Sequence, residues 1–236
     1  MAAWIVFATL VASRALAQAG PFEAPIQWAP VAPQPSAPPE PLVRPSYVPS
    51  MDAMRVMNWV AATGDNNGMP YMVIDKLAAE VFVFNAMSEW VAASPALVGS
   101  AVGDDSSPGV GDRELANIPL DERTTPAGRF VAKFGRAAGG RDVLWVDYPD
   151  AISLHAVVTS NKKERRLQRL KSRGPDDNRI THGCINVPAD FYAKVVKPLF
   201  KTSAGIVYIL PEAKSLNDVF LALPGPRTPA PSQVAQ

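Results

Sequence analysis

The sequence predicts a β-rich α+β domain with a folded or barrel-like mixed sheet and a few helices. Short stretches rich in β-branched and aromatic residues recur through the middle of the chain, and turn residues separate them. Only two stretches have the boundaries of helices. The proline-rich ends leave residues 50–211, about 160 residues, which is enough for one domain with its own core.

Helices and strands can be placed from local signals. Ser50 is a suitable N-cap for a helix that starts at Met51 and stops at Gly64, with Met54, Met57, Val60 and Ala61 on its inner face. A second helix is expected from Ala189 to Lys197, between Pro188 and Pro198. Strands are expected at residues 71–74, 80–84, 129–133, 143–148, 153–159 and 205–210. The polar stretch 99–112 is expected to be a loop.

The first 17 residues have the features of an export signal peptide. Trp4 to Ala12 is an apolar run of nine residues, too short to cross a bilayer. Ala15-Leu16-Ala17 then supplies the A-x-A pattern of a cleavage site. No Lys or Arg precedes the run, so a short buried helix is the alternative. We therefore expect an exported protein of the periplasm or cell envelope.

Two proline-rich segments flank the expected domain. Ten prolines lie between Pro21 and Pro49, where few residues could fill a core. Residues 18–49 are thus expected to form an extended, disordered linker. Residues 212–236 end in a similar composition and are expected to form a tail.

Charge and cysteine content narrow the function. The chain has 23 Lys and Arg against 22 Asp and Glu, and this balance argues against nucleic acid as a partner. A single cysteine, Cys184, can form no internal disulfide. Its thiol is therefore either buried and inert or retained for chemistry.

The only two histidines, His155 and His182, lie within thirty residues of Cys184. A free thiol has a pKa of about 8.5, and a neighbouring imidazole can take its proton and later return it to a leaving amine. Gly183 lets the backbone approach a substrate carbonyl and leaves N–H groups to face an oxyanion. This set predicts a cysteine acyltransferase or hydrolase that needs no cofactor and no metal.

Three segments resemble the L,D-transpeptidase (YkuD-type) catalytic domain. Residues 181–186, THGCIN, are similar to the family's [S/T]HGC-x-N signature. Residues 125–130, TPAGRF, resemble its TPxGxF segment, and Asp75-Lys76 with the strand that follows resembles its opening hairpin. The resemblance covers roughly residues 70–210 and implies a mixed-sheet sandwich with a few helices.

The resemblance also implies roles for individual residues. Cys184 would be the acylated nucleophile, His155 the base, and His182 a residue that lines the site. The N–H groups of Gly183 and Cys184 would form the oxyanion hole. The substrate would be a peptidoglycan stem tetrapeptide, from which Cys184 expels D-alanine before an amine or water resolves the thioester.

The chain departs from the family pattern at two places. Ala156 follows His155 where Gly or Ser is usual, so the group that orients His155 should be a backbone carbonyl or a residue that the sequence does not identify. His155 and Cys184 lie 29 positions apart, further than is usual in the family, and a basic insertion lies between them, residues 161–174, with seven Lys or Arg and one Glu. It could be a substrate-binding lid or a solvated helix with Leu167 and Leu170 inside.

Two further residues flank the catalytic motif. Arg179 could bind a substrate carboxylate or pair with Asp176 or Asp177, and the second interpretation is favoured. Asn186 is expected to brace the loop after the cysteine.

Three alternatives stay open. One is a zinc site formed by His155, His182 and Cys184. Another is a non-catalytic cell-wall-binding domain. The third is a hydrolase on the same fold, because water and an amine compete for one thioester. The sequence does not decide the acceptor or the oligomeric state.

Overall fold

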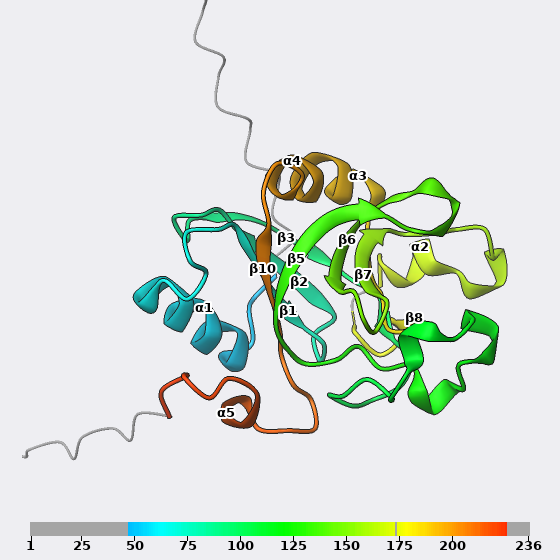
Figure 1. The fold of residues 1–236 in the computed structure, drawn as a ribbon, viewed down its shortest axis with the longest axis horizontal. Coiled ribbons are helices and arrows are strands. Elements are labelled where there is room, and N and C mark those ends of the chain that lie inside the picture. The colour runs from blue at the N-terminus through cyan, green and yellow to red at the C-terminus, as the bar shows by residue number, and fades with distance from the viewer. Residues whose placement is uncertain (1–46, 173, 226–236) are drawn as a thin grey trace, which may run out of the picture. The chain divides into compact units, whose positions relative to one another are not determined.

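A computed structural model describes residues 47–172 and 174–225, all within the unit Pro41–Gln236 (Figure 1). The predicted signal peptide, most of the predicted linker and residues 226–236 lie outside these residues. Among the described helices, none is long and apolar enough to cross a membrane.

An eight-stranded mixed sheet forms the body of the domain. Its strand order is β3-β2-β1-β10-β5-β6-β7-β9, with β1–β10 and β7–β9 parallel and the other pairs antiparallel. The strands are β1 (Tyr71–Asp75), β2 (Glu80–Phe84), β3 (Trp90–Pro95), β5 (Gly128–Arg136), β6 (Asp142–Asp147), β7 (Ile152–Ala156), β9 (Ile185–Val187) and β10 (Gly205–Ile209). A separate two-stranded sheet pairs β4 (Val98–Gly99) with β8 (Arg179–Thr181). This strand-rich α+β arrangement confirms the predicted fold class.

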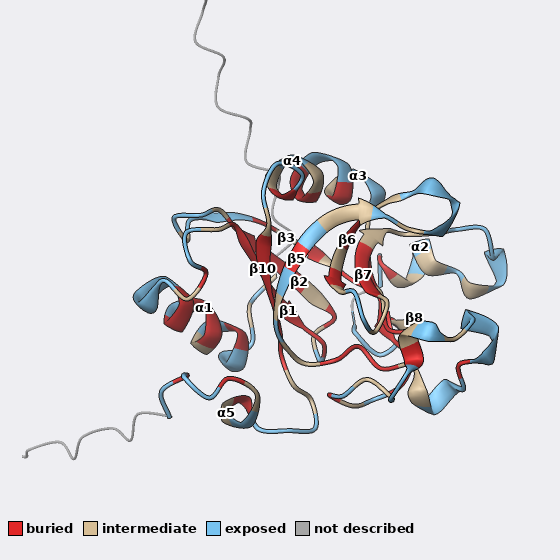
Figure 2. Ribbon diagram, viewed as in Figure 1, coloured by how far each residue is buried: buried red, intermediate tan, exposed pale blue. Residues whose placement is uncertain are grey.

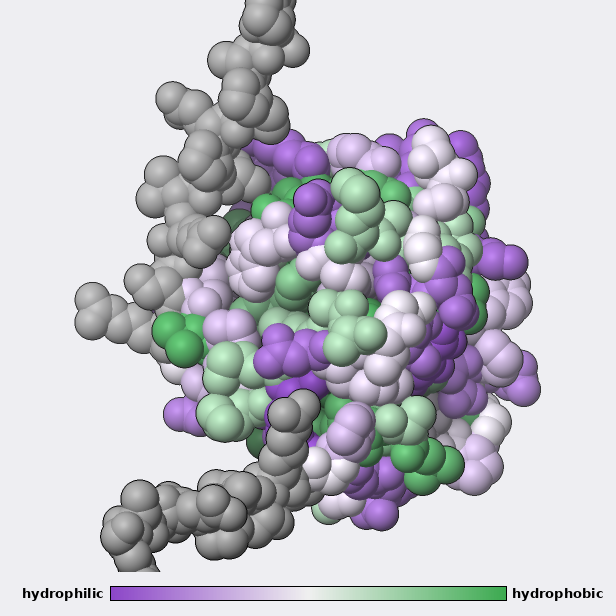
Figure 3. Space-filling model, turned by 90° about the vertical axis from the view of Figure 1, so that its left-hand side faces the viewer, coloured by the Kyte–Doolittle hydropathy of each residue, from purple (hydrophilic) through white to green (hydrophobic). Residues whose placement is uncertain are grey.

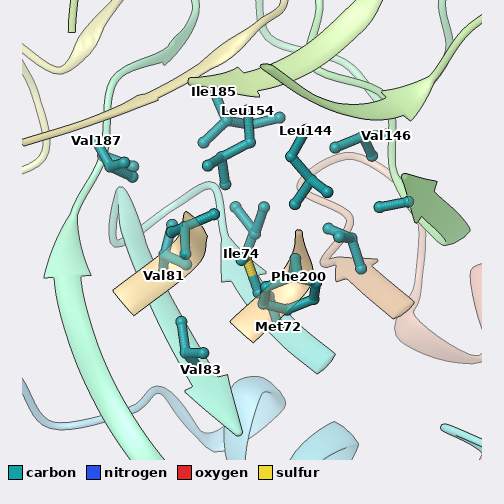
Figure 4. Packing of buried hydrophobic residues seen from close by; sticks show 14 of the residues in the cluster. Met72, Ile74, Val81, Val83, Leu144, Val146, Leu154, Ile185, Val187 and Phe200 are labelled. Carbon is teal, nitrogen blue, oxygen red and sulfur yellow. The ribbon is translucent and has the colours of Figure 1, made fainter. Parts of the chain in front are cut away.

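The main core lies between the two halves of the bent sheet. Residues of β1 and β2, including Ile74 and Val81, face Leu154 of β7 and Ile185 of β9 (Figure 4). Helical turns α3 (Ala189–Phe191), η6 (Tyr192–Val196) and α4 (Lys197–Phe200) close one end of this core. Because β7 and β9 are anchored by buried side chains, the residues at their ends have fixed positions.

A second core covers the other face of β1, β2 and β10. It is built from α1 (Met51–Thr63) and from α5 (Leu216–Val219) with its flanks, which pack on Tyr71, Phe82 and Tyr208. The inner side of α1 is buried and its outer side exposed (Figure 2). The visible surface on this side of the unit mixes hydrophobic and hydrophilic residues (Figure 3).

Short helical turns decorate the loops of the domain. The predicted loop after β4 contains η1 (Val110–Asp112), and η2 (Leu115–Asn117) and η3 (Leu120–Glu122) follow it. The β5–β6 turn contains η4 (Ala138–Gly140). The basic insertion forms η5 (Lys162–Glu164) and α2 (Arg166–Arg169).

The first predicted helix is correct in its limits. Ser50 accepts a hydrogen bond from the Ala53 N–H, and Gly64 ends the helix in the left-handed conformation. Its buried face was partly wrong, since Met54 and Ala61 are exposed while Ala53 and Val56 are buried.

Pro198 does not end the second predicted helix, which continues to Phe200. The five residues before Lys197 form a π turn in which the Lys197 N–H bonds to Tyr192 O. Pro198 then occupies the first turn of α4, where no N–H donor is required.

The domain boundary at Pro211 was also placed too early. Leu216, Phe220 and Leu223 are buried in the second core, and the Glu212 side chain is almost fully buried. At least residues 212–223 therefore belong to the folded domain rather than to a tail. Tyr47, assigned to the linker, also packs against this core.

Candidate active site

The loop His182–Gly183–Cys184, named the nucleophile loop after the predicted role of Cys184, joins β8 to β9. Thr181 closes this turn, because its hydroxyl donates to Cys184 O at 2.6 Å and accepts from the Gly183 N–H at 3.1 Å. From the other side, the Thr125 hydroxyl donates to Gly183 O at 2.7 Å. The loop is therefore held at both ends, and the TPAGRF segment contributes to its support.

Gly183 is required by the geometry of this loop. Its φ of +122° is a conformation that residues with a side chain rarely adopt. A Cβ at this position would lie 2.7 Å from Thr124 O and 2.8 Å from Ile152 Cδ1. Both observations explain why glycine precedes the cysteine.

Cys184 is half-buried and its thiol faces the end of β7. The Sγ atom lies 3.6 Å from Ser153 Oγ and 3.6 Å from Ala151 O. Either the Ser153 hydroxyl or the Cys184 thiol can be the donor in the contact between them.

His155 is held by hydrogen bonds at both ring nitrogens. Its Nδ1 lies 2.8 Å from Ala156 O, and its Nε2 lies 3.2 Å from Asn186 Nδ2. Because a carbonyl can only accept, Nδ1 carries the proton and Nε2 offers a lone pair. The backbone carbonyl of Ala156 is the orienting group that the sequence could only suggest.

Burial lowers the pKa of His155, and the nearby charges of Arg141 and Arg166 lower it further, while the Ala156 carbonyl opposes these effects. The imidazole is therefore neutral near pH 7 and able to accept a proton.

His155 and Cys184 line the same pocket, which has a volume of about 840 Å³. No hydrogen bond joins the two side chains within the described residues, so proton transfer requires the thiol to approach Nε2, as is common in free enzymes. Four cationic side chains, Arg113, Arg136, Arg141 and Lys197, line the pocket together with Asp142. Three of them form ion pairs: Lys197 and Arg136 with Asp142, and Arg113 with Glu122.

His182 does not belong to the lining of this pocket. Burial lowers the pKa of its imidazole, as do the charges of Arg123 and Arg166, while Glu164 acts in the opposite direction. Its position within the loop is consistent with a residue that shapes the site.

The predicted oxyanion hole needs a correction at Gly183. Its N–H is buried and already donates to the Thr181 hydroxyl, so it is not available to an oxyanion in this conformation. The Cys184 N–H precedes the paired residues of β9 and has no acceptor within the described part of the chain. It is the remaining candidate donor of the predicted pair.

Arg179 does not belong to the lining of this pocket, and its assignment as a substrate-binding residue stays a prediction. Its guanidinium pairs with Glu212 and also donates to the Ala101 carbonyl at 3.3 Å. The favoured pairing interpretation was correct, but the partner is Glu212 rather than Asp176 or Asp177. Glu212 comes from the segment that was taken for a tail, so local spacing could not identify it.

A buried lysine supports the same region, and the sequence indicated no role for it in the site. Lys76 Nζ donates to Asp104 at 2.7 Å, to Gly103 O at 2.6 Å and to Thr125 O at 2.9 Å, and it lies 3.5 Å from Glu212. Its side chain is fully buried. Lys76 therefore fixes Thr125, which in turn holds Gly183 in the nucleophile loop.

Asp104 is the main anionic partner of Lys76. Burial alone would raise the pKa of its carboxyl. The hydrogen bonds from Lys76 and from the N–H groups of residues 212–214 outweigh burial and lower the pKa to about 2. Asp104 is therefore ionised at neutral pH.

The basic insertion is neither a plain helix nor wholly solvated. Leu170 is buried, as expected, whereas Leu167 is 52 % exposed. Lys162, Lys163 and Arg165 are exposed, while the Arg166 side chain is only 12 % exposed. The insertion thus exposes Lys162, Lys163 and Arg165 to solvent, whereas the Arg166 side chain is mostly buried.

No protein-family model and no curated protein matches this chain. Twenty-eight solved chains are similar to it. The first of these are L,D-transpeptidase catalytic domains.

The catalytic domain of the Enterococcus faecium L,D-transpeptidase shares 16% identity over 59% of this chain and 95% of its own, with a TM-score of 0.36. The L,D-transpeptidase from Mycobacterium smegmatis shares 17% identity over 59% of this chain and 58% of its own, with a TM-score of 0.36. The helical cell shape determining protein Pgp2 from Campylobacter jejuni shares 15% over 69% and 57%, with a TM-score of 0.42. This chain thus spans less than two thirds of the length of the latter two structures. At such identities, the function has to be argued from the site itself.

Within the described residues, no group of three or more His, Cys, Asp or Glu side chains is arranged to hold a metal ion.

Proposed function

We propose that this protein is an exported L,D-transpeptidase that remodels bacterial cell wall through a thioester on Cys184. One observation carries the proposal: Cys184 and His155 line one pocket, and the Ala156 carbonyl leaves His155 Nε2 as the proton acceptor. The THGCIN and TPAGRF segments, which resemble the family's, are joined by the hydrogen bond from the Thr125 hydroxyl to Gly183 O.

The reaction begins with acylation. His155 Nε2 takes the Cys184 proton, and the sulfur attacks the carbonyl carbon of the L,D-peptide bond in a stem tetrapeptide. The Cys184 N–H faces the developing oxyanion. The C–N bond then breaks, and His155 returns the proton to the leaving amine of D-alanine.

Resolution of the thioester reverses these roles. An amine of a second stem gives its proton to His155 and attacks the thioester carbonyl. The C–S bond breaks, a cross-link forms, and the thiolate regains the proton from His155. Water in place of the amine gives hydrolysis, which makes a carboxypeptidase the second candidate.

Incubation with purified tetrapeptide muropeptides, followed by mass analysis, tests the proposal. We expect D-alanine release with cross-linked dimers, and a tripeptide product alone would favour the hydrolase. Cys184→Ala should abolish both products while keeping the fold, because the new side chain is only slightly smaller. If the alanine variant still releases D-alanine, Cys184 is not the nucleophile.

A second assay needs no acceptor. As the resemblance implies, a strained β-lactam of the carbapenem type should add one acyl group to Cys184, visible by intact mass. An adduct that persists in Cys184→Ala would contradict the assignment.

A further inference from the structure

Among the described residues of the insertion, Arg166 is hydrogen-bonded to a side chain of the active site. Arg166 Nη1 lies 2.6 Å from Asn186 Oδ1, and Asn186 Nδ2 lies 3.2 Å from His155 Nε2. Glu164 holds the other side of the guanidinium, since Arg166 Nε donates to it at 2.5 Å. A three-residue chain of hydrogen bonds therefore runs from the insertion to the proposed base.

The donor and acceptor roles of the three side chains fix the orientation of the Asn186 amide in this series of hydrogen bonds. A guanidinium has donors only, so the Asn186 amide must turn its oxygen toward Arg166. The amide nitrogen then faces His155 and donates to the Nε2 lone pair. Protonated Nε2 would place an N–H against this NH₂ group, leaving two donors in contact with no acceptor between them.

Asn186 cannot escape this conflict by moving away. It is 1 % exposed, and its backbone N–H and C=O both pair with Leu97, at 2.9 and 2.8 Å. Only rotation of its amide could present the oxygen to a protonated His155, and Arg166 opposes that rotation.

We propose that Arg166 is a positioning residue: through Asn186 it disfavours protonation of His155 and keeps the imidazole neutral in the free protein. This role rests on the proposed function only in that His155 is the base. Because the thiol proton must reach the nitrogen that Asn186 occupies, the amide also competes with the incoming proton.

Other charges face His155 and must be separated from this effect. Arg141, ahead of β6, acts on the imidazole through its charge, and Cys184 shares the pocket. The more distant charged groups in the lining are Arg113, Arg136, Asp142 and Lys197. Loss of any nearby cation raises the pKa of His155, so a raised pKa by itself does not show that Arg166 acts through Asn186.

The test is an NMR titration of the full-length protein with ¹⁵N-labelled histidine. The chain has only two histidines, so a His182→Gln variant assigns the signals. In the neutral wild type, we expect a protonated Nδ1 and an unprotonated Nε2 for His155. The opposite tautomer would overturn the proposal without any further variant, even if the substitutions below fail to fold.

The variants then separate orientation from charge. Arg166→Met should raise the titration midpoint of His155 by about one pH unit or more, because the amide can rotate and accept from protonated Nε2. In an Asn186→Leu background the same change should give a clearly smaller rise, from lost charge alone. Arg141→Met is the matched control and should give a charge-only rise in both backgrounds.

An equal rise for Arg166→Met in both backgrounds would overturn the proposal, because the effect would then be purely electrostatic. The titration needs no substrate, so its outcome is independent of whether muropeptides are cross-linked. Conversely, an equal rise would leave the Cys184 chemistry of the proposed function untouched.

Discussion

Replacing Gly183 with alanine should destabilise the protein far more than the same change at Gly64. Both residues have positive φ, +122° and +69°. At Gly64 no atom lies within 4 Å of the added Cβ, whereas at Gly183 the Cβ meets Thr124 O at 2.7 Å. Both sites carry a backbone penalty, which is larger at Gly183 because its φ lies outside the left-handed helical region, and only Gly183 adds a steric clash.

The magnitudes follow from these two terms. An unfavourable backbone conformation costs about 1–3 kcal/mol, and overpacking at a rigid backbone atom adds about 1–3 kcal/mol. We expect Gly64→Ala to cost about 1 kcal/mol and Gly183→Ala about 2–6 kcal/mol. Urea unfolding followed by tryptophan fluorescence measures both. Equal losses in the two variants would refute the idea that Thr124 leaves no room for a side chain beside Cys184.

Three further predictions concern the base, a buried charge pair and the insertion. His155→Gln should slow iodoacetamide alkylation of Cys184 near pH 7 by about 10²-fold or more, and His182→Gln should slow it less; an unchanged pH profile would remove His155 as the base. Asp104, with its pKa lowered to about 2, stabilises the fold above about pH 4. In acid titrations of stability this contribution, about 2 kcal/mol, should disappear as the pH falls from 4 to 2. Asp104→Asn should be less stable at neutral pH but should lack that acid-dependent loss. Replacing the three exposed cations Lys162, Lys163 and Arg165 with Gln should weaken binding to whole sacculi and reduce the salt dependence of that binding, while tetrapeptide turnover stays unchanged. Equal losses in both assays would mean that the insertion shapes the groove.

Arg166 is left out of that triple variant for a reason that the sequence could not give. Within residues 161–174 it is one of seven cations with no distinguishing neighbour. Only the fold brings it to Asn186, twenty positions away. An experiment that neutralised Arg166 with its neighbours would confuse surface charge with the environment of His155.

The parts of the site that could be predicted from the sequence are those whose contacts join residues close together along the chain. Thr181, Gly183 and Cys184 form a tight turn whose contacts span two or three residues, so their spacing already carries the geometry. Strands β1 and β2 were placed correctly for the same reason, since they form an antiparallel pair joined by a short turn.

Long-range electrostatic contacts were not predictable in this way. Arg179 and Glu212 are 33 residues apart, and Lys76 and Asp104 are 28 apart. Nearer carboxylates such as Asp176 were equally plausible partners on charge alone. Burial decides between them, because only a carboxylate fixed inside the fold compensates a buried cation.

The position of β10 has a consequence for the order in which the protein can fold. This last strand, residues 205–209, lies in the middle of the sheet between β1 and β5. The half formed by β3, β2 and β1 therefore cannot join the half formed by β5, β6, β7 and β9 until nearly the whole domain has been synthesised. Such non-local pairing is slow. A chain with this topology stays incomplete while it emerges from the ribosome, which would suit the export proposed for it.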